Sequence, residues 1–301
     1  MQQFFEYSPE VEDALKHKKP ILALESTVIT HGLPYPHNLE TAQTLERIVK
    51  AHAVVPATIA IIKGKIKIGL TPSDLEYLVH EPNVFKASTR DLPYLLSQGL
   101  SAGTTVAATL YCADAAGIKV FATGGIGGVH RGSEQDVSAD LIELARTPMA
   151  VVSSGVKAIL DLPKTLQFLE TFGIPIVGYR THTLPAFYTA ETNYKLPARI
   201  DTLPELVKLL KVHWQLGMTS SILIANPIPK EDEIPVEYIE PVINEALRQA
   251  AEKDLQGKEI TPFILNEVMH ATEGKSLQAN IQLLKNNITL GAMLAHAIAN
   301  I

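Results

Sequence analysis

The chain has 301 residues, of which 46% are hydrophobic, enough to bury a sizeable core in one large α/β domain or two small ones. Its formal net charge is -6 and it contains no block of like charges, which argues against a nucleic-acid surface or a polybasic membrane patch. Because no apolar run of about 18 residues occurs and the N-terminal segment lacks the pattern of a secretory signal, we expect a cytoplasmic protein acting on a small molecule.

Short apolar, β-branched segments alternate with longer helical patterns along most of the chain. This alternation is typical of βαβ units and predicts an α/β fold: one three-layer α/β/α domain over residues 1–301, with a largely parallel central sheet and C-terminal helices packed against it. The predicted strands are residues 21–24, 58–62, 84–87, 120–123, 150–152, 176–179 and 221–225. The predicted helices are residues 38–52, 71–78, 104–116, 139–145, 156–172, 202–216, 236–256 and 276–299, the last two joined by a connector at 258–265.

Several predicted strands end in short polar or glycine-bearing turns. In open α/β sheets, ligands bind beyond the carboxyl ends of the strands, so we expect these turns to converge on one site. The turns are EST after Leu24, STRD after Ala87, GGIGG after Thr123, SSG after Val152 and NPIP after Ala225.

One lysine follows a predicted buried strand, in the stretch VVSSGVKAILD. With Ser153 or Ser154 as a helix N-cap, Lys157 would lie in the first helical turn, where the positive end of the helix dipole and apolar neighbours favour the uncharged amine. A free amine attacks carbonyl carbons and forms Schiff bases, which points to covalent catalysis. On the local pattern alone, an outward-facing surface lysine is the alternative.

Glu25 directly follows the apolar run ILAL, at the carboxyl end of a predicted strand. A partly desolvated carboxyl group there would have the raised pKa that a general acid or base needs. A residue that only caps the next turn is the alternative. The nearby Thr27, Thr30 and His31 disfavour a purely solvated loop.

Residues 122–132, ATGGIGGVHRG, are rich in glycine but do not match G-x-G-x-x-G, because the third position is His130. The lysine and hydroxyl that end a G-x-x-x-x-G-K-S/T nucleotide loop are missing too. We expect a loop whose backbone approaches an anion, with His130 and Arg131 beside it. A plain turn with a surface arginine is the alternative.

Two carboxylates, Asp136 and Asp140, flank a predicted helix start at Ser138. A carboxylate beyond the needs of capping can hold a hard divalent cation such as Mn²⁺ or Mg²⁺, which keeps several waters and is shared with substrate. Two acids drawn to a first turn by the helix dipole are the alternative. The ten histidines have no zinc-binding spacing, so we expect no zinc.

Cations and hydroxyls gather in KASTRD (86–91), and GTTVAAT (103–109) places hydroxyls and backbone N–H groups at a predicted helix start. Together they suit a phosphate monoester, although KASTRD could be only a charged turn. Asn280, on an amphipathic helix, could read the edge of a base or merely tie the helix to a loop. We interpret the single cysteine, Cys112, as a small apolar side chain in a reducing compartment.

These motifs, with ALESTVITHGLPYP, GIPIVGY, ANPIP and GKEITPF, resemble in order and spacing the pseudouridine-5′-phosphate glycosidase family over about residues 8–295. The resemblance implies a homotrimeric lyase that uses Mn²⁺ or a similar ion and reversibly cleaves pseudouridine 5′-phosphate to uracil and ribose 5-phosphate. It implies Lys157 as Schiff-base nucleophile, Glu25 as proton donor and Asp136 as metal ligand. The further substrate-binding residues that it implies are Lys86, Val106, Thr123, His130, Ser138, Ala139, Asp140 and Asn280.

One segment departs from the family pattern: residues 133–135 form a shorter loop before Asp136 than is usual. Two other functions also fit part of the sequence. Lys157 and the anion-binding loops alone suit an aldolase-like Schiff-base enzyme on other sugar phosphates. A non-catalytic nucleotide-binding protein with the same fold is the alternative of a different class.

Overall fold

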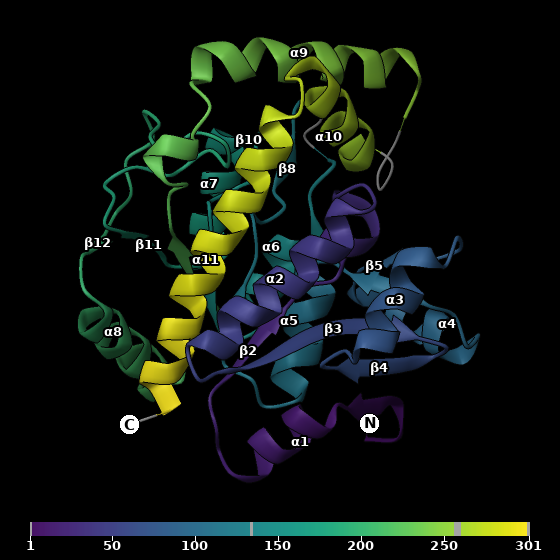
Figure 1. Ribbon diagram of the computed structural model, residues 1–301. Coiled ribbons are helices and arrows are strands. Elements are labelled where there is room, and N and C mark those ends of the chain that lie inside the picture. Colours follow the sequence, from purple (N-terminus) through teal and green to yellow (C-terminus); the bar gives the residue numbers. More distant parts are fainter. Residues whose placement is uncertain (1, 133–134, 256–259, 300–301) are drawn as a thin grey trace.

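The computed structural model describes residues 2–132, 135–255 and 260–299 of the chain. A central sheet separates two layers of helices (Figure 1), in the strand order β1-β4-β3-β2-β7-β9-β13-β11-β12, with β6 paired to both β3 and β5. Every neighbouring pair from β3 to β12 along this order is parallel, whereas β3 pairs antiparallel with β4 and β6. The predicted three-layer α/β/α fold with a largely parallel sheet is therefore confirmed.

The sheet strands are β1 (Phe5–Tyr7), β2 (Ile21–Leu24), β3 (Val55–Ile62), β4 (Lys65–Ile68), β5 (Phe85–Ala87), β6 (Ala102–Thr104), β7 (Val120–Ala122), β9 (Ala150–Ser153), β11 (Ile176–Tyr179), β12 (Arg199–Ile200) and β13 (Ile222–Ala225). A separate antiparallel pair is formed by β8 (Val129–His130) and β10 (Leu160–Asp161). The α-helices are α1 (Pro9–Lys16), α2 (His37–Ala51), α3 (Pro72–His80), α4 (Leu92–Ser97), α5 (Val106–Ala115), α6 (Ala139–Leu144), α7 (Leu162–Thr171), α8 (Leu203–Gln215), α9 (Val236–Glu252), α10 (Ile260–Ala271) and α11 (Lys275–Ala299).

The predicted helix over residues 156–172 begins later than expected, at Leu162. Asp161 caps α7 by accepting a hydrogen bond from the Lys164 N–H at 3.0 Å. Before it, Gly155 has a φ of +71°, and the Lys157 N–H donates to the Ile126 carbonyl at 3.1 Å. Residues 155–157 thus run beside the glycine-rich segment, so the predicted cap at Ser153 or Ser154 and the helical setting of Lys157 were both wrong.

The C-terminal part also contains a helix where a connector was predicted. Residues from Ile260 to Ala271 form α10, with Pro262 in the first turn, a position where proline costs no backbone hydrogen bond. Lys258 and Glu259 lie outside the described residues. As Figure 1 shows, α9 crosses one end of the molecule and packs on α10 rather than on the sheet, whereas α11 packs on β2, β7 and β9 as expected.

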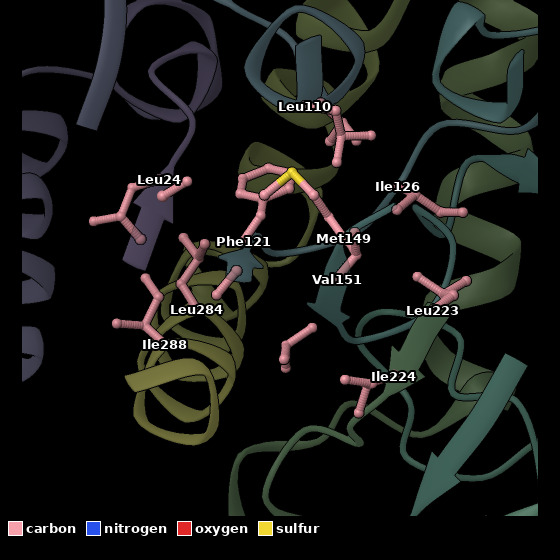
Figure 2. Close-up of a cluster of buried hydrophobic side chains, with 14 of the residues drawn as sticks. Leu24, Leu110, Phe121, Ile126, Met149, Val151, Leu223, Ile224, Leu284 and Ile288 are labelled. Carbon is pink, nitrogen blue, oxygen red and sulfur yellow. The ribbon is translucent and has the colours of Figure 1, made fainter. Parts of the chain in front are cut away.

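The core fills both spaces between the sheet and its helix layers. Figure 2 shows Phe121 of β7 between Leu110 of α5 on one side and Leu284 and Ile288 of α11 on the other. All four side chains are at most 2% exposed. Burial on both faces explains why the central strands are continuous apolar runs. Among the described residues, no helix is both long enough and apolar enough to span a membrane.

A glycine allows α11 to approach the sheet closely. A Cβ at Gly291 would lie 2.9 Å from the Ala122 Cβ and 3.1 Å from Leu22 Cδ1. Both neighbours belong to buried strands of the close-packed core and cannot move aside. A larger side chain at this position would therefore push α11 away from the sheet.

We therefore expect Gly291→Val to lower the free energy of unfolding by about 1–3 kcal/mol, although valine has the better helix propensity. Urea denaturation followed by circular dichroism measures the change. Met293→Val, at an exposed position of the same helix, is the matched control and should change stability by less than about 0.5 kcal/mol. Equal stability of the Gly291→Val protein and the parent would contradict this account of the helix contact.

Candidate active site

Turns at the carboxyl ends of the sheet strands meet around a small cavity of 60 Å³, which we call the inner chamber. Glu25 follows β2, Gly124 follows β7, Lys157 follows β9, and Lys86 lies on β5. Phe187 and the first turn of α10 close its other sides, and Asn280 reaches it from α11. The predicted convergence of these turns on one site is confirmed for those that follow β2, β7 and β9.

Glu25 is the buried carboxyl group of the inner chamber, with 7% of its surface exposed. Its two oxygens each accept a hydrogen bond from a threonine hydroxyl, Oε2 from Thr27 and Oε1 from Thr123. Thr27 follows it in the same turn, and Thr123 directly follows the neighbouring strand β7. These two hydroxyls fix the carboxyl group at the chamber wall. Thr123 itself is 1% exposed and lies behind Glu25.

Lys157 and Lys86 line both the inner chamber and a second, larger space beside it. This second space, the charged cavity, has a volume of 260 Å³. Its charged lining consists of Lys86, Arg90, Asp136, Asp140 and Lys157. Lys157 is therefore placed to reach a ligand that extends from one space into the other.

The charged cavity has the composition of an oxyanion site. Arg90 and the Thr105 hydroxyl, which caps α5, line it together with Ser88. The Ser88 hydroxyl is buried and faces the Asp91 N–H in a capping box, but within the described part of the chain it donates to no group. A buried hydroxyl beside two cations can donate its proton to a ligand oxygen. Val106, the first residue of α5, has a buried side chain, so only its backbone can contribute.

Asp140 is the carboxylate that holds this region together. It is 4% exposed, and its Oδ1 accepts from the Ala107 N–H at 2.9 Å while Oδ2 accepts from the Gly127 N–H at 2.8 Å. The Ser138 hydroxyl caps the same helix by accepting from the Asp140 N–H at 3.2 Å. One buried side chain thus joins the start of α5, the glycine-rich segment and the start of α6. Ala139, between these residues, also lines the charged cavity.

Asp136 is the more exposed carboxylate, with a side-chain exposure of 38%. Its Oδ2 lies 4.0 Å from His130 Nδ1. Burial lowers the pKa of His130 and nearby Lys86 and Lys157 lower it further, while Asp136 opposes them, so the imidazole is neutral at neutral pH. Among the described residues, no three His, Cys, Asp or Glu side chains are grouped closely enough to enclose a metal ion. A single carboxylate in a cavity lined by cations and hydroxyls fits a divalent cation that keeps most of its waters.

Two other predicted features take different places. Arg131 does not face the charged cavity: it forms an ion pair with Glu240 of α9, and its Nη2 donates to the Ala158 carbonyl at 2.8 Å. The expected arginine beside the anion was therefore wrong. Burial raises the pKa of Cys112 to about 12, so its thiol stays protonated in the core. Residues 133 and 134 of the short loop lie outside the described residues.

The glycines of residues 124–128 allow close packing of neighbouring side chains, and two of them also line the inner chamber. A Cβ at Gly127 would lie 2.2 Å from the Ser138 hydroxyl and 2.6 Å from Asp140 Oδ2. A Cβ at Gly125 would lie 2.7 Å from Phe187. The segment follows no nucleotide fingerprint because its glycines serve these particular contacts.

Sequence reasoning missed Phe187, the start of α10 and Asn287. Asn287 is fully buried, and its amide donates to the Thr123 and Gly124 carbonyls at 2.8 and 3.2 Å. The available signal was its spacing of seven residues from Asn280, which puts both amides on one face of a helix. Phe187 and α10 carried no comparable signal.

The sequence and the fold both have close relatives. The family model of indigoidine synthase A-like proteins matches residues 10–297. The pseudouridine-5′-phosphate glycosidase of Caldanaerobacter subterraneus subsp. tengcongensis is 54% identical over 297 residues, 98% of this chain and 97% of that protein. The enzyme of the same name from Geobacillus kaustophilus is 52% identical over 99% of this chain and 100% of its own length.

Two solved structures share the fold, each with a TM-score of 0.91. One is the prealnumycin C-glycosynthase AlnA in complex with ribulose 5-phosphate, 36% identical over 99% of this chain and 98% of that one. The other is an indigoidine synthase A-like protein from Thermotoga maritima, 35% identical over 98% of this chain and 97% of that one.

The two backbone bonds of Asp140 generate a prediction. In Asp140→Asn the amide keeps one acceptor oxygen, so one of the Ala107 and Gly127 N–H groups faces another donor. We expect a loss of about 1–3 kcal/mol in unfolding free energy, measured by urea denaturation. Asp114→Asn, at a half-exposed aspartate paired with Lys119, is the control and should cost less than about 1 kcal/mol. Similar losses in the two variants would refute the role of Asp140.

Proposed function

The chain belongs to the family of indigoidine synthase A-like proteins, and we propose that it is a pseudouridine-5′-phosphate glycosidase, which reversibly cleaves pseudouridine 5′-phosphate to uracil and ribose 5-phosphate. The observation that carries this proposal is the inner chamber, where the carboxyl group of Glu25 and the side chain of Lys157 line one small cavity. The cationic space beside it suits the phosphate of the same substrate.

The bond to be broken explains why an amine is needed. The base is attached through carbon, so no leaving-group oxygen exists for the paired carboxylates of ordinary glycosidases to protonate. In our proposal the Lys157 amine bonds to the anomeric carbon as the ring C–O bond breaks, which opens the furanose. The carbon–carbon bond then breaks with its electron pair going to uracil, and the anomeric carbon becomes an imine of Lys157.

Glu25 serves the departing base in this scheme. Its carboxyl group gives a proton to C5 of uracil, so the base leaves as a neutral molecule. Water then adds to the imine, and ribose 5-phosphate and the free amine are restored. In the synthetic direction the carboxylate takes the C5 proton back. The hydroxyls of Thr27 and Thr123 hold the carboxyl group in place for both steps.

The charged cavity binds the phosphate and orients the sugar. Lys86 and Arg90 supply positive charge, and the Ser88 and Thr105 hydroxyls with the Val106 backbone supply hydrogen bonds. Binding energy from a phosphate remote from the scissile bond can be used to position the anomeric carbon against Lys157. His130, Ser138 and Ala139 line the same wall.

We propose one Mn²⁺, or a similar divalent ion, bound through Asp136. When bound, such an ion neutralises negative charge on the sugar phosphate and orders water around it. Asp140 is not its ligand in this proposal, because both oxygens already accept backbone hydrogen bonds. The homotrimer and the cytoplasmic location remain our expectations; the trimer is tested by light scattering of the purified protein.

Trapping the imine tests the mechanism. Incubation with ribose 5-phosphate and borohydride should attach the reduced sugar phosphate to Lys157, as located by peptide mass spectrometry. Lys157→Ala should abolish labelling and lower the cleavage rate by about 10³-fold or more. Lys208→Ala, at an exposed lysine of α8, is the control and should behave as the parent.

If the protein is active and binds ribose 5-phosphate but borohydride leaves Lys157 unmodified, the covalent mechanism is wrong. Cleavage of ketose phosphates without synthesis from uracil and ribose 5-phosphate would favour the aldolase-like alternative. Ligand binding that persists in Lys157→Ala, with no turnover by the parent, would indicate a non-catalytic nucleotide-binding protein.

The metal proposal has a separate test. Asp136→Asn should weaken Mn²⁺ binding by at least about 10–100-fold, as read from the electron paramagnetic resonance signal of free Mn²⁺. Asp114→Asn controls for a loss of surface charge. Unchanged binding by Asp136→Asn would place the ion elsewhere.

A further inference from the structure

A third space, the uncharged cavity, opens on the side of the inner chamber away from the charged cavity. It has a volume of 240 Å³ and lies between residues 30–34, α10 and the start of α11. Within the described part of the chain, its lining includes no aspartate, glutamate, lysine or arginine. Its walls are side chains such as Leu33, Met269 and Leu277, with the amides of Asn266 and Asn280.

The three spaces form a series with the inner chamber in the middle. The uncharged cavity shares His31, Gly32, Pro262, Leu265 and Asn280 with the inner chamber. The charged cavity shares Thr27, Lys86, Lys157 and Thr261 with it. The two outer spaces share no described lining residue. The inner chamber therefore adjoins two different spaces, one with charged lining residues and one without them among the described residues.

The lining of the uncharged cavity includes both buried and exposed residues. Asn280, at its inner end, is 7% exposed, whereas Pro34 and Asn266 are exposed. His31 stands beside Asn280 at this junction, and its Nδ1 is joined to the Thr30 hydroxyl by a hydrogen bond of 2.7 Å. An imidazole held by a hydrogen bond and an amide together offer donors and acceptors to a planar polar ring.

We propose that the uncharged cavity is the passage through which the free pyrimidine base leaves and enters the inner chamber. This inference rests on the proposed function, in which the base departs while the sugar phosphate is still covalently attached to Lys157. The attached sugar phosphate then occupies the charged side, so the base has the neutral side left to it. The lining suits the passage of a base, because its polar groups can form hydrogen bonds with a neutral ring. Its described residues include no lysine or arginine that would bind a phosphate dianion.

Narrowing the passage from opposite walls tests the proposal. Met269→Trp on α10 and Leu277→Trp on α11 add bulk at half-buried lining positions that do not touch the inner chamber. In the synthetic direction, each variant should lower kcat/KM for uracil about tenfold or more. Borohydride trapping of ribose 5-phosphate on Lys157, which needs no base, should stay within about twofold of the parent. Met293→Trp, at an exposed methionine of α11, is the matched control.

The outcomes separate this inference from the proposed function. If the parent protein neither traps ribose 5-phosphate nor forms product with uracil, the proposed function fails. If the parent does both and the two tryptophan variants use uracil as the parent does, the base travels elsewhere and only the passage is overturned. Equal losses in trapping and in uracil use by both variants would also overturn it, because they would indicate a disturbed site rather than a narrowed route.

Discussion

A single buried amide connects the C-terminal helix to the strand ends on which the site depends. The side chain of Asn287 donates to the carbonyls of Thr123 and Gly124, and its oxygen accepts from the Asn226 amide at 3.0 Å. These partners follow β7 and β13, and Ser154, also bonded to Asn287, follows β9. Strand ends in a dry interior need hydrogen-bond partners for their backbone groups. By supplying them, α11 fixes the turn that carries Thr123, the hydrogen-bond partner of Glu25, and the turn that leads to Lys157.

The same principle divides the two neighbouring aspartates into different roles. Asp140 is buried against two backbone N–H groups, so its charge is used to hold loops together. Asp136 is half-exposed, lines the charged cavity and lies 4.0 Å from His130 Nδ1. One aspartate of this region thus serves the structure of the loops, whereas the other lines the cavity.

Much of the fold follows from the sequence because its central strands are short apolar runs that must be covered on both faces. The region around Lys157 did not follow, since its conformation comes from a positive φ at Gly155 and pairing with Ile126, distant in sequence. Local sequence patterns singled out Glu25, Lys157 and Asp136 as candidates, and the three line two adjoining cavities. The sequence patterns could not tell which of the two aspartates would accept hydrogen bonds from backbone N–H groups, because that depends on which loops meet in space.

Arg131 connects the outer helix α9 to the segment that follows Lys157. Its guanidinium group binds Glu240 on α9 and the carbonyls of Ala158 and Leu160, which lie just beyond Lys157 in the chain. Because α10 packs on α9, the cover of the inner chamber and the turn that carries Lys157 are braced to one another through this side chain. The position of the outer helix α9 is therefore tied, through one side chain, to the backbone that directly follows Lys157.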